Sequence, residues 1–105
     1  MICCCVKKND NSYEIDVRGH SGYDTIGKDI VCSSVSTAMI ITVNLLERFN
    51  FKFDFSSNNK IPMMNLKVTK CDDKYNNIVI ILDNLVSCLE DVSKQYNKFL
   101  IIKYL

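Results

Sequence analysis

The chain has 105 residues, of which 48% are hydrophobic and 10% aromatic. This composition excludes a disordered protein and is sufficient for one two-layer core, so we expect residues 1–105 to form a single domain. Thirteen basic and twelve acidic residues leave a formal net charge of +1, so charge gives no support to direct nucleic-acid binding.

Export and membrane insertion are not expected either. The apolar start "MICCCV" lacks the basic leader and the length of a signal peptide. A membrane span needs about eighteen continuous apolar residues, and the longest candidate, "IVIILDNLV", is interrupted by Asp83 and Asn84. We therefore expect a cytoplasmic protein with no membrane partner.

The chain opens with a predicted hairpin. Residues 2–6 are typical of a short strand, and residues 7–12 form a turn rich in Asn, Asp and Ser. Residues 13–19 alternate between apolar and polar side chains, which predicts a strand with one wet face. The apolar side would carry Tyr13, Ile15 and Val17, and the polar side Glu14, Asp16 and Arg18.

A helix is predicted from about Asp29 to near Arg48, because apolar residues recur there every three or four positions. Asp29 suits the N-cap, where its carboxylate can accept the free amides of the first turn. The apolar positions make a stripe so wide that we expect the helix to be mostly buried. They are Ile30, Val31, Val35, Ala38, Met39, Ile41, Thr42, Leu45 and Leu46.

The second half repeats this pattern of strands followed by a helix. Strands are predicted at 51–55 and 63–70, with a loop at 56–62 around the only proline. Asp72 or Asp73 can cap a second helix, which has an apolar stripe to Tyr96, and residues 98–105 are typical of a final strand. The order β-β-α-β-β-α-β predicts an α+β two-layer sandwich, with a small, mostly antiparallel sheet and two helices.

The six cysteines do not indicate disulfides, because a reducing cytosol keeps thiols free. No C-x-x-C pair exists, so neither a metal site nor any other cofactor is expected. Except for Cys32, we interpret the cysteines as small apolar core residues. These are Cys3, Cys4, Cys5, Cys71 and Cys88.

The stretch "GHSGYDTIGKDIVCSS", residues 19–34, holds every glycine of the chain and its only histidine. Cys32 would lie in the first turn of the predicted helix, where the positive end of the dipole and unpaired amides stabilise a thiolate. The same amides could bind an oxyanion. A thiolate with His20 nearby is the minimal apparatus of thiol acyl transfer.

Each feature also has a structural interpretation. Cys32 could be a buried core cysteine, His20 a strand-end residue without a task, and the glycines simple turn formers. Phosphate binding is disfavoured, because the glycine spacing lacks the G-K-[ST] ending of a Walker loop.

The segment "GHSGYDTIGKDIVCSSVS", residues 19–36, resembles the ribosomal-processing cysteine protease family. The order of the predicted elements and the chain length match that family over the whole chain. The resemblance implies a small mixed sheet with two helices and a homodimer. It also implies an activity: removal of the N-terminal extension from the precursor of large-subunit ribosomal protein L-twenty-seven, with a cut after an aromatic residue.

By position in the motif, the resemblance gives Cys32 the role of nucleophile and His20 that of general base. Asp29 and Ser36 match two further polar positions. We interpret Asp29 mainly as the N-cap. Ser36 lies one turn after Cys32 and could hydrogen-bond the thiolate or the substrate, or instead its own helix backbone.

The segment departs from the family pattern only by small residues. Ser21 stands where alanine is usual, and Ser33 and Ser34 replace an alanine pair. We expect these changes to affect fine substrate specificity and not the Cys–His chemistry.

The clustered glycines suggest a flexible loop. We hypothesise that residues 19–28, with Gly19, Gly22 and Gly27, form a mobile lid that opens to admit a peptide and closes to bring His20 to Cys32. Two other functions stay open: a non-enzymatic ribosome-assembly or protein-binding module with the same fold, and a different thiol hydrolase such as an esterase.

Overall fold

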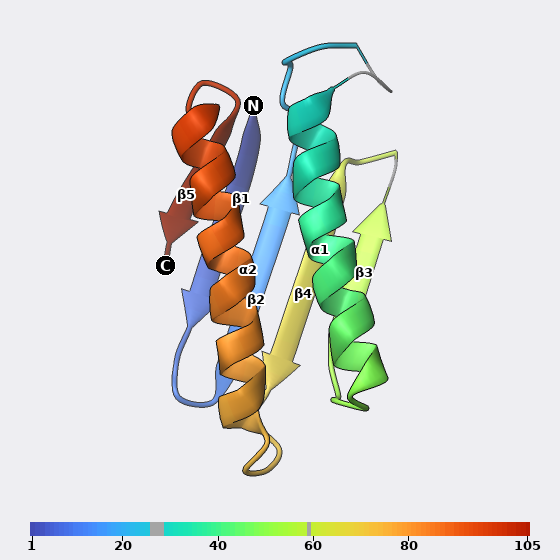
Figure 1. Cartoon of the computed structure of the whole chain (residues 1–105), viewed down its shortest axis with the longest axis vertical. Coiled ribbons are helices and arrows are strands. Elements are labelled where there is room, and N and C mark those ends of the chain that lie inside the picture. Colours follow the sequence, from blue (N-terminus) through green and yellow to red (C-terminus); the bar gives the residue numbers. More distant parts are fainter. Residues whose placement is uncertain (26–28, 59) are drawn as a thin grey trace.

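The computed structural model describes residues 1–25, 29–58 and 60–105 (Figure 1). Its elements follow the predicted order β-β-α-β-β-α-β. They are β1 (Ile2–Lys8), β2 (Ser12–Arg18), α1 (Ile30–Arg48), β3 (Asp54–Asn58), β4 (Met63–Thr69), α2 (Tyr75–Gln95) and β5 (Leu100–Tyr104).

The five strands form one sheet in the order β3-β4-β2-β1-β5. Only the β1–β5 pair is parallel, so the sheet is mixed and mostly antiparallel, as predicted. At the end of β2, Arg18 lies opposite Cys3 on one side and Met63 on the other. The glycine-rich segment therefore leaves the sheet at the end where β1 and β4 begin.

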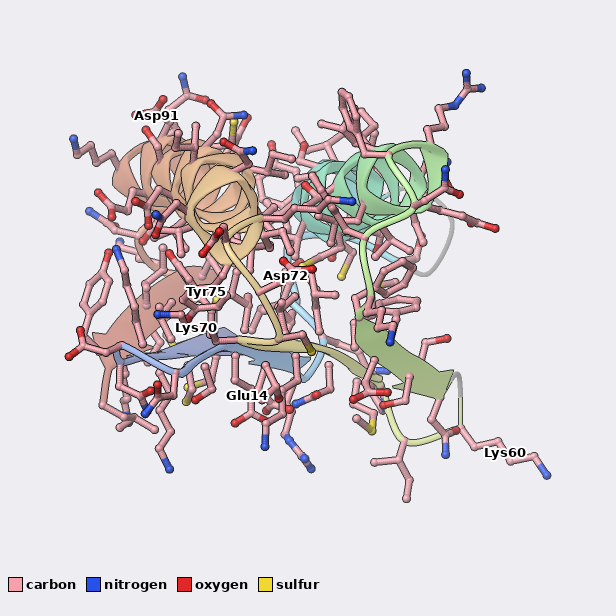
Figure 2. All side chains as sticks on the ribbon, turned by 90° about the horizontal axis from the view of Figure 1, so that it is seen from below. Glu14, Lys60, Lys70, Asp72, Tyr75 and Asp91 are labelled. Atoms are coloured by element: carbon pink, nitrogen blue, oxygen red, sulfur yellow. The ribbon has the colours of Figure 1, made fainter. Side chains whose placement is uncertain are left out.

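Both helices cover the same face of the sheet, and the opposite face is open (Figure 2). Tyr13, Ile15 and Val17 of β2 are buried toward the helices, while Glu14 points away from them. On the open face the amide of Asn65 donates to Glu14 and Asp16. The predicted two-layer sandwich and the alternation in β2 are both confirmed.

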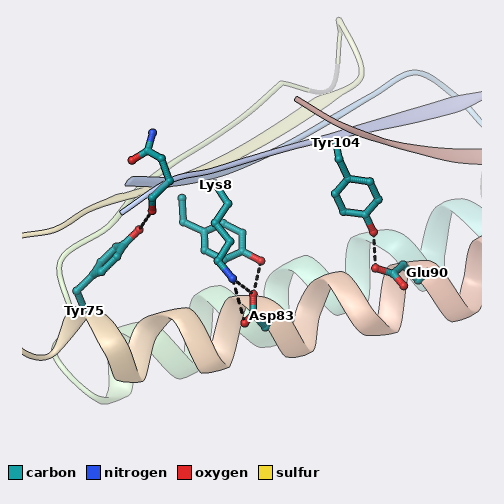
Figure 3. A network of polar contacts seen from close by, with 7 residues as sticks. Lys8, Tyr75, Asp83, Glu90 and Tyr104 are labelled. Carbon is teal, nitrogen blue, oxygen red and sulfur yellow. Dashed lines mark hydrogen bonds and ion pairs between the residues drawn. The ribbon is translucent and has the colours of Figure 1, made fainter. Parts of the chain in front are cut away.

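Polar contacts fasten α2 to the sheet along its length (Figure 3). Asp83 accepts from the Tyr13 hydroxyl at 2.7 Å and from Lys8 Nζ at 3.1 Å. One end of the helix is tied by the hydroxyl of Tyr75, which donates to a backbone carbonyl at the β1–β2 turn. Burial, with the hydrogen bond to Asp83, raises the pKa of Tyr13, so its phenol stays protonated and serves as a donor.

The strand predicted at 51–55 is displaced: β3 runs from Asp54 to Asn58, three residues later. The amide of Phe51 donates to the carbonyl of Leu46 in α1 at 3.0 Å, so this part of the chain is still bonded to the helix. Residues 51–53 lead from the helix layer to the sheet. The predicted loop at 56–62 correspondingly begins too early.

The predicted cap of the second helix is wrong at the residue level. The N-cap of α2 is Lys74, which makes no side-chain capping bond. Asp72 instead accepts from the Lys74 amide at 2.8 Å, and its carbonyl accepts from Tyr75. Asp72 therefore closes the turn before the helix, and Asp73 does not cap it.

The first helix is less buried than predicted. Its inner face, including Val31, Val35 and Met39, is in the core, but Ile41 and Leu45 are exposed. Among the described helices, α1 alone has the length and apolar composition that a membrane crossing would need. Its inner face packs against α2 and the sheet, so some of its apolar side chains lie in the core and the others on the outer surface of the helix.

The interpretation of the cysteines as core residues holds for one of them and fails for others. Cys4 is fully buried, and burial raises the pKa of its thiol to about 12. Cys71 and Cys88 are exposed, because they lie outside the helical and strand positions that face the core. Cys3 and Cys5 are half-buried on the open face of the sheet, with Sγ atoms 3.9 Å apart.

Candidate functional site

The N-terminus of α1 is built around Asp29. As predicted, Asp29 is the N-cap: its Oδ1 accepts from the amides of Val31 and Cys32, both at 3.0 Å. Cys32 is the third residue of the helix and is half-buried. The cap thus fixes the backbone of the turn that carries the thiol.

The second carboxylate oxygen of Asp29 holds the glycine-rich segment. Oδ2 accepts from the hydroxyl of Ser21 and, at 3.5 Å, from the amide of Asp24. Asp29 is buried, which by itself raises its pKa, but the bonds from Ser21, Cys32, Asp24 and Val31 outweigh burial and lower the pKa to about 2. Asp29 is therefore charged at neutral pH.

Two of the first-turn amides are not the free oxyanion donors that the sequence suggested. Asp29 already occupies the amides of Val31 and Cys32. The donor to the sulfur comes from elsewhere: the backbone amide of Ser21 donates to Cys32 Sγ at 3.4 Å. An amide aimed at sulfur stabilises the negative charge of a thiolate.

The glycines have distinct backbone roles. Gly19 has φ +100°, and a Cβ there would lie 2.6 Å from the carbonyl oxygen of Met1. Gly22 has φ +73° with open space around it, so only its backbone conformation requires glycine. Gly27 lies outside the described residues, and the mobility hypothesised for residues 19–28 stays a prediction.

The predicted site residues line one cavity of about 830 Å³. Its lining includes Cys32 and Ser36 from α1 and the exposed side chain of His20 from the segment after β2. Asp29, Gly19 and Gly22 lie along the same cavity. Much of the remaining lining is apolar, from Ile2, Val17, Val35, Pro62, Met63 and Met64.

An aromatic contact seats the glycine-rich segment on the other helix. The ring of Tyr23 packs edge-on against those of Tyr96 and Phe99, at centroid distances of 5.5 and 5.2 Å. Tyr96 ends α2 and Phe99 precedes β5. The segment is therefore held between α1 and the far end of α2 (Figure 1).

This arrangement places a thiol, an imidazole and an apolar wall around one open cavity. Such a site can bind a peptide by an apolar side chain and present its carbonyl to the sulfur. Among the described residues, no group of three or more His, Cys, Asp or Glu side chains could hold a metal ion.

Four residues that contribute to the site could not be identified as such from the sequence. Ser21 was considered only as a small residue, and Tyr23 was not singled out. The sequence predicts Met63 and Met64 only as part of a strand, and the pairing of β4 with β2 brings them to the cavity that Cys32 also lines.

Gly19 and Gly22 provide a matched pair of substitutions. We expect Gly22→Ala to lower the free energy of unfolding by about 1 kcal/mol, the cost of a left-handed residue. Gly19→Ala adds a collision with the Met1 carbonyl and should cost more than about 2 kcal/mol. Urea denaturation measures both, and equal losses would contradict the roles given to the two residues.

Asp29 should make stability depend on pH at the acid end. Because folding lowers its pKa to about 2, the unfolded chain binds the proton more tightly. The stabilisation is complete above about pH 4 and is lost as the pH falls toward 2, and it amounts to roughly 2 kcal/mol. Asp29→Asn should remove this dependence in urea denaturation between pH 2 and 5. The control is Asp24→Asn, and an unchanged profile for Asp29→Asn would refute the network.

Several solved structures share the fold of this chain. The crystal structure of an essential ribosomal processing protease Prp from S. aureus, with a covalently linked product peptide, superposes with a TM-score of 0.86 at 20% identity over all of both chains. The same protease with a substrate peptide gives a TM-score of 0.82 at 19% identity, again over all of both chains. The protein SMU.848 from Streptococcus mutans gives 0.85 at 19% identity, over all of this chain and 94% of that one.

These likenesses establish the fold. Among curated protein sequences, none matches this chain. The sequence profile described as cysteine protease Prp matches residues 1–101, nearly the whole length. The chain, with its thiol on a capped helix beside a glycine-rich segment, therefore belongs to the Prp family of cysteine proteases.

Proposed function

We propose that this protein is a cysteine endopeptidase that removes the N-terminal extension from the precursor of ribosomal protein L-twenty-seven. The observation that carries the proposal is that the Cys32 sulfur accepts a hydrogen bond from the Ser21 amide and lines the same cavity as His20. Membership of the Prp family supports the reaction class. The S. aureus relative, bound to a substrate peptide, supports a peptide substrate.

Cys32 is the nucleophile in this proposal. Its thiolate attacks the scissile carbonyl carbon, the C–N bond breaks, and the amine leaves with a proton from the His20 imidazolium. Neutral His20 then takes a proton from water, the oxygen of which attacks the thioester. The acid is released and the sulfur is regenerated.

The remaining site residues bind or position. Ser36, one turn after Cys32 on the cavity wall, is placed to hydrogen-bond the substrate or the sulfur. Asp29 supports catalysis indirectly by fixing the first turn of α1. The apolar wall that includes Met63 and Met64 suits the aromatic side chain before the cut, because Met adapts to aromatic rings.

We further propose a homodimer in the cytoplasm. An apolar row on the outer face of α1, at four-residue spacing, contains Ile41, Leu45 and the C-cap Phe49. Ile41 is 61% and Phe49 58% exposed. Because this row is apolar and carries no charge, the same row of a second copy can pack against it across a two-fold axis without repulsion. All six cysteines are free, which suits a reducing compartment.

The catalytic roles are tested by Cys32→Ala and His20→Ala. Each should abolish cleavage of a precursor peptide that carries the extension, with little change in melting temperature, because His20 is exposed and Cys32 is only half-buried. Mass spectrometry of the products locates the cut. Cys88→Ala, an exposed cysteine on α2, is the control and should retain full activity. Cleavage by Cys32→Ala would overturn the assignment.

Alkylation separates the protease from a non-enzymatic module of the same fold. Iodoacetamide should label Cys32 at neutral pH much faster than the exposed Cys88 of the same chain, because a nucleophilic thiol reacts as the thiolate. Labelling only in alkali would favour the module. Hydrolysis of simple esters without peptide cleavage would favour another thiol hydrolase.

The dimer is tested by placing a charge in the outer row of α1. Ile41→Asp should shift the protein from dimer to monomer in light scattering, because burying an unpaired carboxylate is costly. The matched control is Ile80→Asp, which replaces an isoleucine 68% exposed on α2 and should leave the dimer intact. A wild-type protein that is monomeric throughout the micromolar range would refute the proposal.

A further inference from the structure

Ser21 is a buried polar residue in a segment that is otherwise largely exposed. It is only 3% exposed, whereas His20 before it and Gly22 after it are exposed. Burial of a hydroxyl is costly unless it is fully bonded. Ser21 meets that requirement: its Oγ donates to Asp29 Oδ2 and accepts from the Tyr23 amide at 3.1 Å.

The same residue also touches the sulfur. Its backbone amide donates to Cys32 Sγ at 3.4 Å. Through its hydroxyl and its amide, Ser21 therefore joins the segment that carries His20 to the cap and the thiol of α1. Because His20 directly precedes it in the chain, the position of Ser21 determines where the imidazole can reach.

We propose that Ser21 is a positioning residue: its hydroxyl, bonded to Asp29, aims its backbone amide at Cys32 Sγ and sets the reach of His20. The contact to the sulfur uses only the backbone of residue 21, whereas the bond to Asp29 needs the hydroxyl, so a substitution can separate the two.

Ser21→Ala tests the hydroxyl alone, since it removes one oxygen and adds no bulk. Without the bond to Asp29, the amide is held less firmly against the sulfur, and the thiolate loses stabilisation. We expect the midpoint of the pH profile of Cys32 alkylation by iodoacetamide to rise by about one pH unit. Other titratable groups that line the cavity with Cys32 are His20, Asp24 and Asp29, so the profile is recorded in parallel for His20→Ala.

The turnover measurement rests on the proposed function, whereas the alkylation measurement does not. With the precursor peptide, Ser21→Ala should lower kcat by about tenfold and leave KM nearly unchanged, because orientation rather than binding is lost. If the wild type fails to cut while the alkylation midpoint still shifts, the protease assignment fails and the role of Ser21 stands.

Ser34→Ala is the matched control. Ser34 is an exposed serine near the start of α1, and within the described part of the chain its hydroxyl bonds only to the carbonyl of Ile30, at 2.6 Å. It should leave both measurements unchanged. If Ser21→Ala lowers the melting temperature but keeps the wild-type alkylation profile and kcat, the residue is merely structural and the proposal is overturned.

Discussion

The site depends on one carboxylate. Asp29 uses one oxygen to cap α1 and the other to hold the segment that follows β2. These are two separate parts of the chain, and the charge satisfies donors from both. A neutral residue could cap the helix, but a carboxylate offers enough acceptor positions to do both at once. The lowered pKa of Asp29 reflects this sharing.

The order of the strands determines where the segment that Asp29 holds leaves the sheet. Because β2 lies between β4 and β1, the segment after Arg18 emerges beside the start of both neighbours. Gly19 passes so close to Met1 that a side chain would not fit, and its amide bonds the Pro62 carbonyl at 3.0 Å. The chain then turns toward α1, with Tyr23 packed on Tyr96 and Phe99. The cavity lies between this segment, the start of α1 and the adjacent ends of the strands.

Three parts of the surface of α1 have different environments. Its first turn presents the thiol, its inner face joins the core, and its outer face is apolar yet exposed. A helix on one side of a sheet needs only one apolar stripe to fold. The fold does not explain the second apolar stripe, and the homodimer that we propose would cover it.

Much of the architecture could be predicted from local patterns. The alternation at Tyr13, Ile15 and Val17 placed β2, and the apolar spacing with Asp29 placed α1 and its cap, because both depend on near neighbours in the chain. The motif also singled out Cys32 and His20, which line the same cavity. Local pattern misplaced β3, since the Phe51 amide binds α1 rather than a strand.

Other features were decided only by tertiary structure. The exposure of Ile41 depends on how much of α1 the sheet covers, and the presence of Met63 in the cavity that Cys32 lines depends on the pairing of β4 with β2. The sequence by itself determined the position of α1, its cap at Asp29 and the place of the Cys32 thiol in the first helical turn, because these follow from spacing and side-chain chemistry. Tertiary structure alone decided that the sulfur takes its donor from Ser21, because contacts between distant segments depend on packing that no local pattern encodes.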